Sequence, residues 1–120
     1  MNAIAVVEDD STVSEALEAL LQAMGHSVMT FERAEDLLAS PALSQISCLI
    51  TDIQLRGISG LDLQERLRAA GHDIPFIVVT AFPDERVRER ALKLGAVAFL
   101  VKPVRKAHLV AALTQVIGSP

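Results

Sequence analysis

The chain has 120 residues, 51% of them hydrophobic, which suits one compact domain over residues 1–120 with a core of its own. A formal net charge of −4 argues against direct nucleic-acid binding, because neutralising phosphates requires a basic surface. No apolar stretch approaches the ~20 residues of a membrane span and no signal peptide is recognisable, so we expect a cytoplasmic domain without membrane contact.

Five short apolar runs predict β-strands, and most of them are continuous instead of alternating. Continuous runs are typical of strands buried on both faces, as in a parallel sheet covered by helices. The runs lie at residues 3–7, 27–31, 46–51, 75–80 and 97–101. The single cysteine, Cys48, lies in the third run and is interpreted as a small core residue, not a nucleophile.

Apolar residues at helical spacing lie between these runs. Six residues from Val13 to Met24 repeat at i, i+3, i+4, i+7, i+8 and i+11 and form a wide stripe that Gly25 ends. Shorter repeats predict helices around residues 34–40, 63–70, 87–94 and 109–117. This alternation predicts an α/β fold, a doubly wound five-stranded parallel sheet with five helices in three α/β/α layers, because right-handed crossovers place helices on both faces.

Polar residues follow the predicted strands at their carboxyl ends, where sheets of this kind bind ligands. The first run ends at Glu8 and Asp9, the third at Asp52, the fourth at Thr80 and the fifth at Lys102. Carboxylates at this density suit a hard cation such as Mg²⁺, which would offset the repulsion among them. A lysine beside such a cation is suited to neutralising a phosphoryl oxygen.

Structural roles for the same residues stay open at this point. Asp10 or Ser11 is suited to capping the first helix. Asp52 could equally cap a helix or turn, Thr80 could be an ordinary strand residue, and Lys102 could be a solvated surface lysine. The combination at four strand ends is what favours a site.

These motifs resemble the receiver domain of bacterial response regulators over essentially the whole chain. The resemblance rests on the acidic pair after the first strand, Asp52, Thr80-Ala81 and Lys102-Pro103. It implies a flavodoxin-like fold with strand order 2-1-3-4-5 and a phosphorylation-dependent signalling switch in a two-component system. The phosphoryl donor would be a sensor histidine kinase or a phosphotransfer protein.

The resemblance also implies roles for individual residues. Asp52 would be the phosphoryl acceptor, assisted by Lys102 and Thr80. Mg²⁺, with Mn²⁺ as a substitute, would be held by three carboxylates and one backbone carbonyl: Glu8, Asp9, Asp52 and the carbonyl of Gln54. Thr80 and Phe99 would form the switch, and a cis peptide between Lys102 and Pro103 would aim the lysine into the site. The modulators of the phosphorylated state would be Gln54, Ala81 and Phe82.

Three features depart from the common pattern of the family. Arg56 stands where a proline is frequent, so we expect a more mobile loop over residues 54–60. Ala98 stands where many relatives have an acid, which weakens the case for dimer contacts through a charge there. The acidic pair Glu8-Asp9 is a known variant that should still bind metal.

The resemblance implies an output face made by the fourth helix, the fifth strand and the fifth helix, which would contact an effector that controls transcription. A homodimer on phosphorylation is a further expectation. Nearby arginines are interpreted as a solvated helix face: Arg86, Arg88 and Arg90. The histidines are expected to face solvent and to bind no metal: His26, His72 and His108. Residues 118–120 are interpreted as the start of a linker to an effector domain.

Three other functions stay open. A Mg²⁺-dependent phosphatase with an aspartyl nucleophile would need an acid/base group and a substrate-enclosing cap, for which 120 residues leave no room. A flavin-binding electron carrier would need a phosphate-binding loop where acids stand, and a ring partner, although the chain has no Trp or Tyr. A degenerate receiver regulated without phosphate would not need the complete set of acidic residues, Thr80 and Lys102 that this sequence has.

Overall fold

A computed structural model describes residues 3–55 and 57–117 of the chain. Arg56 and the linker predicted at residues 118–120 lie outside this range, and the mobility of the loop around Arg56 stays a prediction. No helix within the described range is long and apolar enough to cross a membrane.

The predicted α/β fold is confirmed. Five parallel strands form one sheet in the order β2-β1-β3-β4-β5. Their bounds are β1 Ala3–Val7, β2 Val28–Phe31, β3 Ile46–Asp52, β4 Phe76–Thr80 and β5 Ala98–Val101. The helices are α1 Ser11–Ala23, α2 Ala34–Leu38, α3 Gly60–Ala69, α4 Glu85–Lys93 and α5 Lys106–Ile117, with a short 3-10 helix, Leu43–Gln45, that the apolar pattern did not predict.

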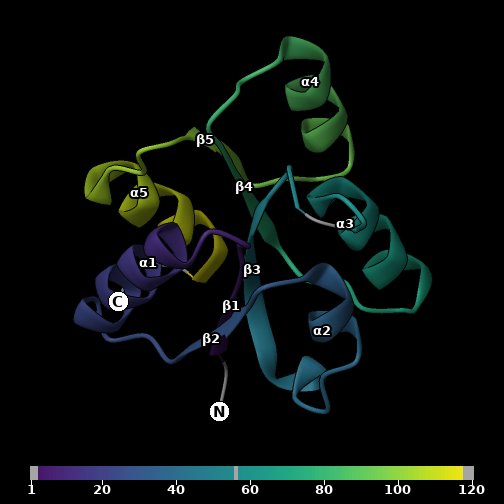
Figure 1. Ribbon diagram of the computed structural model, residues 1–120, viewed down its shortest axis with the longest axis horizontal. Helices are drawn as coiled ribbons and strands as arrows, with labels where there is room; N and C mark the ends of the chain where they lie inside the picture. Colours follow the sequence, from purple (N-terminus) through teal and green to yellow (C-terminus); the bar gives the residue numbers. More distant parts are fainter. Residues whose placement is uncertain (1–2, 56, 118–120) are drawn as a thin grey trace.

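Helices cover both faces of the sheet, α1 and α5 on one side and α2, α3 and α4 on the other (Figure 1). Successive strand residues enter opposite cores, as a pleated strand requires. In β1, Ile4 and Val6 pack with Leu17 of α1, whereas Ala5 packs on the side of Leu67 in α3. Both cores are apolar, which explains why the strand runs are continuous.

Cys48 is fully buried in the core beneath α1 and α5. Burial raises the pKa of its thiol to about 12, so the thiolate is not formed at neutral pH. The interpretation of Cys48 as a core residue is confirmed.

Side-chain caps set the starts of the helices earlier than the apolar repeats predict. Asp10, not Ser11, caps α1, and its Oδ1 accepts hydrogen bonds from the backbone N–H groups of Thr12 at 2.9 Å and Val13 at 3.3 Å. Ser59 caps α3 by accepting from the N–H of Asp62 at 3.1 Å. Capping satisfies backbone donors that lie before the first buried residue, so the helices extend beyond their apolar stripes.

The expectation for the histidines was partly wrong. His108 is exposed, but His26 and His72 are half-buried. Each follows a glycine with positive φ at a helix C-terminus, and its N–H donates back into the helix, to Leu21 for His26 at 3.1 Å. This Schellman geometry folds the histidine over the helix end.

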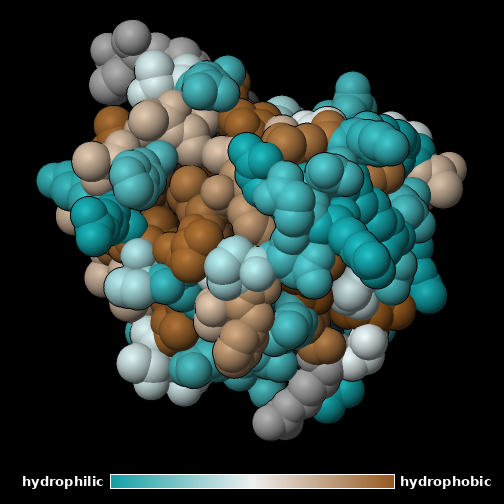
Figure 2. All heavy atoms as spheres, turned by 90° about the horizontal axis from the view of Figure 1, so that it is seen from above, coloured by the Kyte–Doolittle hydropathy of each residue, from teal (hydrophilic) through white to brown (hydrophobic). Residues whose placement is uncertain are grey.

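Hydrophobic side chains gather in one area of the face in Figure 2, among hydrophilic ones. Across the described residues, the exposed large hydrophobic side chains are Phe82, Leu92, Val101 and Val110. Phe82 follows β4, and the others lie one each on α4, β5 and α5.

Candidate functional site

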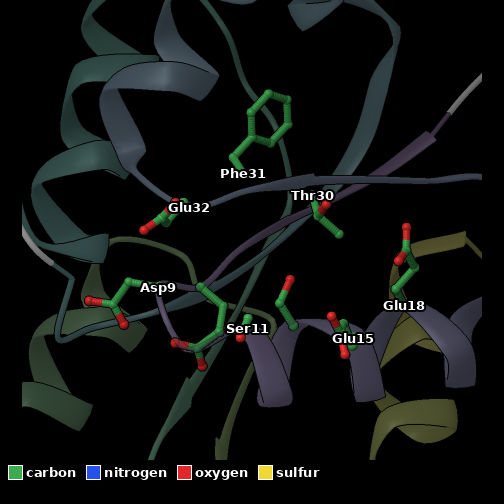
Figure 3. Close-up of a pocket in the computed structure, with 9 residues that line it drawn as sticks. Asp9, Ser11, Glu15, Glu18, Thr30, Phe31 and Glu32 are labelled. Atoms are coloured by element: carbon green, nitrogen blue, oxygen red, sulfur yellow. The ribbon is translucent and has the colours of Figure 1, made fainter.

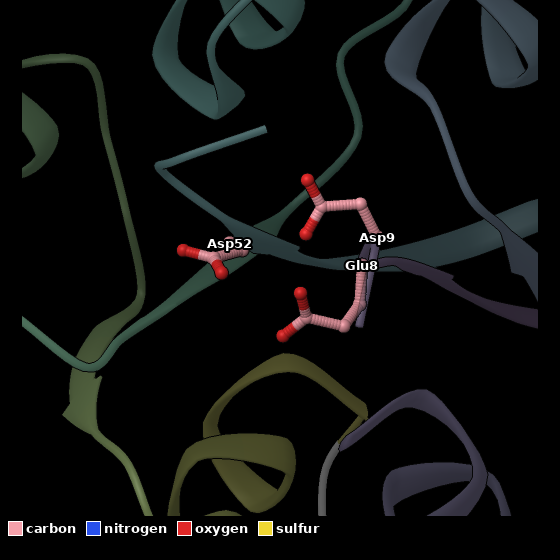
Figure 4. Close-up of side chains that lie close together, drawn as sticks. All are labelled: Glu8, Asp9 and Asp52. Carbon is pink, nitrogen blue, oxygen red and sulfur yellow. The ribbon is translucent and has the colours of Figure 1, made fainter. Parts of the chain in front are cut away.

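Parallel pairing of β1 and β3 brings three carboxylates together. Val7 lies opposite Thr51, so the residues that follow them, Glu8 and Asp52, meet at the same edge of the sheet. Glu8 is 2% exposed and Asp52 6% exposed, whereas Asp9 is half-buried. One oxygen from each of the three carboxylates lies within 4.8 Å of the others (Figure 4). The predicted acidic cluster is therefore present.

Lys102 reaches the same cluster from the end of β5. Its Nζ donates a hydrogen bond to Asp52 Oδ2 at 2.7 Å and another to Glu8 Oε1. The lysine is positioned by the pairing of Thr80 with Val101, and its own N–H donates to the Thr80 carbonyl at 2.8 Å. The peptide bond between Lys102 and Pro103 is cis.

The ion pairs of Lys102 show how the repulsion between the adjacent carboxylates is partly offset without a metal. The sequence predicted that a dication would offset their repulsion, but in the structure the ammonium of Lys102 lies between Glu8 and Asp52. The lysine therefore compensates part of the negative charge by itself. A dication bound at these carboxylates would be a second cation beside Lys102.

This arrangement shifts the pKa of Glu8 and of Lys102. Burial raises the pKa of Glu8 above its ordinary value, and the hydrogen bond from Lys102 only partly opposes this. Burial tends to lower the pKa of Lys102, but its hydrogen bonds to Asp52 and Glu8 outweigh burial and raise it. Lys102 is therefore a full positive charge at neutral pH.

The backbone around Asp52 holds its carboxylate in place. Asp52 Oδ1 accepts a hydrogen bond from the N–H of Gln54 at 3.0 Å, while Oδ2 accepts from Lys102. Thr51 Oγ1 donates to the Asp52 carbonyl at 2.9 Å. Both carboxylate oxygens are thus engaged, although the side chain of Gln54 itself is exposed.

Gly60 at the start of α3 packs directly on this backbone. A Cβ at position 60 would lie 2.2 Å from the Asp52 carbonyl oxygen and 2.9 Å from Thr51 Oγ1. Both distances are too short for a real contact, so any side chain at position 60 must displace the end of β3 or the start of α3. The sequence indicated Gly60 only as a residue that permits a tight turn in the loop, because the close approach to Asp52 depends on packing.

Gly60→Ala is expected to lower the free energy of unfolding by about 2 to 3 kcal/mol, as overpacking in a close-packed interior does. The matched control is Gly25→Ala, where positive φ costs about 1 kcal/mol but no atom lies within 4 Å of the new Cβ. Urea unfolding of both variants measures the difference. An equal or smaller loss for Gly60→Ala would contradict the close approach to Asp52.

Of the residues predicted to form a switch, Thr80 ends β4 and its carbonyl accepts a hydrogen bond from the backbone N–H of Lys102, whereas Phe99 lies within β5. Thr80 is buried, and its Oγ1 accepts a hydrogen bond from the N–H of Phe82 at 3.1 Å. Ala81 is exposed, and the ring of Phe82 is 70% exposed. Phe99 is half-buried and packs against the core on the α3 side. In this structure the Thr80 hydroxyl thus interacts with the loop that follows β4.

A second acidic feature, which sequence analysis missed, lies beside the cluster. A pocket between α1 and the end of β2 is lined by Glu8, Asp9, Ser11, Ser14, Glu15, Glu18, Thr30, Phe31 and Glu32 (Figure 3). Glu15 and Glu18 are spaced i, i+3, so the helical period could have shown that they share a face. Their approach to Glu32 depends on how α1 packs against β2, which sequence spacing does not give.

The donor set of the acidic cluster fits a hard dication. Three carboxylates supply oxygen ligands, which Mg²⁺ prefers, and the part of the cluster at Asp9 is open enough to admit the water ligands that Mg²⁺ usually retains. The candidate residues for a metal are therefore Glu8, Asp9 and Asp52.

Comparison with known proteins points to one family. The family model described as response regulator receiver domain matches residues 4–114. The response regulator protein TodT of Pseudomonas putida is 37% identical over 110 residues, which cover 92% of this chain and 48% of TodT. The transcriptional regulatory protein FixJ of Azorhizobium caulinodans is 36% identical over 113 residues, which cover 94% of this chain and 54% of FixJ.

Solved structures agree with these sequence matches. The response regulator StyR matches with a TM-score of 0.88 and 38% identity, over 97% of this chain and 59% of the StyR chain. The chain spans about half the length of the curated relatives it matches.

Proposed function

Because the chain belongs to the response regulator receiver family of two-component signalling, we propose that it is a switch operated by phosphorylation of Asp52. The observation that carries this proposal is the convergence of Glu8, Asp9 and Lys102 on the Asp52 carboxylate. A phosphoryl group brings negative charge, and this edge of the sheet offers the ammonium of Lys102 and a set of oxygens suited to a metal to receive it.

We assign the chemistry of transfer as follows. A carboxylate oxygen of Asp52 bonds to the phosphorus of a phosphohistidine on a sensor kinase or phosphotransfer protein. The P–N bond breaks, and its electron pair stays on the imidazole. Lys102 neutralises one phosphoryl oxygen, and the N–H of Gln54 keeps the acceptor oriented.

Magnesium is the proposed cofactor, and manganese is a substitute with the same ligand preference. Glu8, Asp9, Asp52 and the backbone carbonyl of Gln54 would hold it, and it would supply positive charge for the phosphoryl oxygens. Since Lys102 contacts one oxygen each of Glu8 and Asp52, the metal and the ammonium would be held by the same two carboxylates.

The proposed output is a shift between two populated conformations. Thr80 would exchange the N–H of Phe82 for the phosphoryl group, and Phe99 would turn inward with it. Ala81 and Phe82, which follow Thr80, and the side chain of Gln54, which follows Asp52 by two residues, would modulate the lifetime of the acyl phosphate.

The proposed output face consists of α4, β5 and α5. Leu92, Val101 and Val110 expose one apolar side chain from each of these elements, which suits contact with an effector. By analogy with the relatives named as transcriptional regulators, the effector would control transcription. Dimerisation on phosphorylation would use the same face.

Incubation with acetyl phosphate and Mg²⁺ tests the proposal. Intact-mass spectrometry is expected to show one added phosphoryl group per chain. EDTA is expected to prevent this gain, because without the metal Lys102 alone cannot neutralise the phosphoryl oxygens beside three carboxylates. Mn²⁺ should restore it. No gain with either metal would contradict the proposal, and rapid turnover of many phosphate esters would favour an aspartyl phosphatase instead.

A further inference from the structure

Helix α4 is attached to the core through little apolar surface. Of the residues of α4, all within the described range, Ala91 is buried and Val87 is half-buried. Helix α3 buries five residues, among them Leu63 and Leu67. Figure 1 shows α4 beside α3 on the same side of the sheet. Contacts between these two helices therefore add to the little apolar surface that holds α4.

Beside the shared apolar core, three residues of α3 make polar contacts to α4 and its C-cap. Arg90 Nη2 donates to Glu65 Oε1 at 2.8 Å and lies 3.5 Å from Asp62 Oδ1. Arg68 Nη2 donates at 2.5 Å to the carbonyl of Leu94, which caps the C-terminus of α4. We call this set, Asp62, Glu65, Arg68, Arg90 and the Leu94 carbonyl, the α3–α4 clasp. It joins α4 to α3 over the last turn and a half of α4.

Arg68 and Arg90 contribute to the α3–α4 clasp in different ways. Arg68 supplies a charged donor to one of the carbonyl groups that a helix leaves unpaired at its C-terminus. Arg90 faces two carboxylates, and its hydrogen bond to Glu65 is the main reason that its pKa is raised. By contrast, Arg88 forms an ion pair with Glu85 of α4 itself, at 3.4 Å, which does not join the helices.

We infer that the α3–α4 clasp holds α4 in its unphosphorylated position and thereby limits how readily Asp52 is phosphorylated. This inference rests on the proposed function, and it adds to that function a second position of α4 that phosphorylation favours. A contact made in one of two states shifts the equilibrium toward that state by its own free energy. The clasp side chains are about half exposed, so the shift should be about two- to fivefold.

Arg90→Gln tests the inference, with Arg88→Gln as the matched control. Both arginines lie on α4 and both side chains are 50% exposed, but only Arg90 contacts α3. Hydrogen–deuterium exchange of the α4 amides, measured without phosphodonor, should be about two- to fivefold faster in Arg90→Gln and close to wild type in Arg88→Gln. The initial rate of labelling by acetyl phosphate should rise by a similar factor in Arg90→Gln alone.

Two further measurements separate the clasp from a general loss of structure. At about 1 M salt, where the screening length falls to about 3 Å, the difference between the two variants should largely disappear. The charge swap Arg90→Glu with Glu65→Arg should recover much of the slow exchange. Equal exchange in Arg90→Gln and Arg88→Gln would overturn the clasp. Faster exchange without faster labelling would overturn its control of phosphorylation, whereas absence of labelling in the wild type would instead overturn the proposed function.

Discussion

Asp52→Asn is expected to abolish labelling of the chain by acetyl phosphate in the presence of Mg²⁺. The amide that replaces the carboxylate is not a nucleophile for phosphorus, although its oxygen can still accept the hydrogen bond that Gln54 donates to Asp52. The substitution therefore removes the reaction while preserving the shape of the site. Intact-mass spectrometry after treatment with the phosphodonor measures the outcome.

Asp73→Asn is the matched control, because Asp73 is exposed and lies outside the acidic cluster. It should be labelled like the wild type. Circular dichroism should show both variants folded, so that a loss of labelling is not a loss of structure. Labelling of Asp52→Asn at the wild-type level would contradict the assignment of the acceptor.

Lys102→Met is expected to have two opposite effects on stability, one without metal and one with Mg²⁺. In metal-free solution it should lower the free energy of unfolding by about 2 kcal/mol, because the buried carboxylates of Glu8 and Asp52 lose the cation between them. Added Mg²⁺ should then stabilise the variant more than the wild type, because the dication no longer competes with an ammonium for these oxygens. Labelling by acetyl phosphate should nevertheless be much slower.

Urea unfolding with EDTA and with saturating Mg²⁺ measures both effects on stability. Lys106→Met is the control, since Lys106 is an exposed lysine at the start of α5. It should change neither the metal-free stability nor the response to Mg²⁺ appreciably. A smaller Mg²⁺ response in Lys102→Met than in the wild type would contradict the view that lysine and dication share the same carboxylates.

The arrangement of strands and helices followed from the sequence because its signals are local. Continuous Val- and Ile-rich runs predicted buried strands, and repeats such as Val13 to Met24 predicted helices. Since parallel strands end at one edge, the meeting of Glu8 with Asp52 could also be predicted. The cap of α1 at Asp10 was one of two candidates, but the start of α3 was missed by a few residues because its cap, Ser59, lies outside the apolar stripe.

Features that depend on packing between distant segments could not be predicted. The double hydrogen bond of Lys102 to Glu8 and Asp52 depends on how the chain turns after β5. Arg90 was correctly predicted on a solvated helix face, but its carboxylate partners on α3 depend on where α4 lies beside α3. Gly60 has no signature of its own, since its importance comes from the nearby Asp52 carbonyl.

Direct mapping of the phosphoryl group tests the central claim. After treatment with acetyl phosphate and Mg²⁺, reduction with borohydride converts an aspartyl phosphate to homoserine, which peptide mass spectrometry locates. We predict one homoserine per chain, at position 52. A homoserine at position 9, or a stable phosphoryl group on a serine, threonine or histidine, would contradict the account.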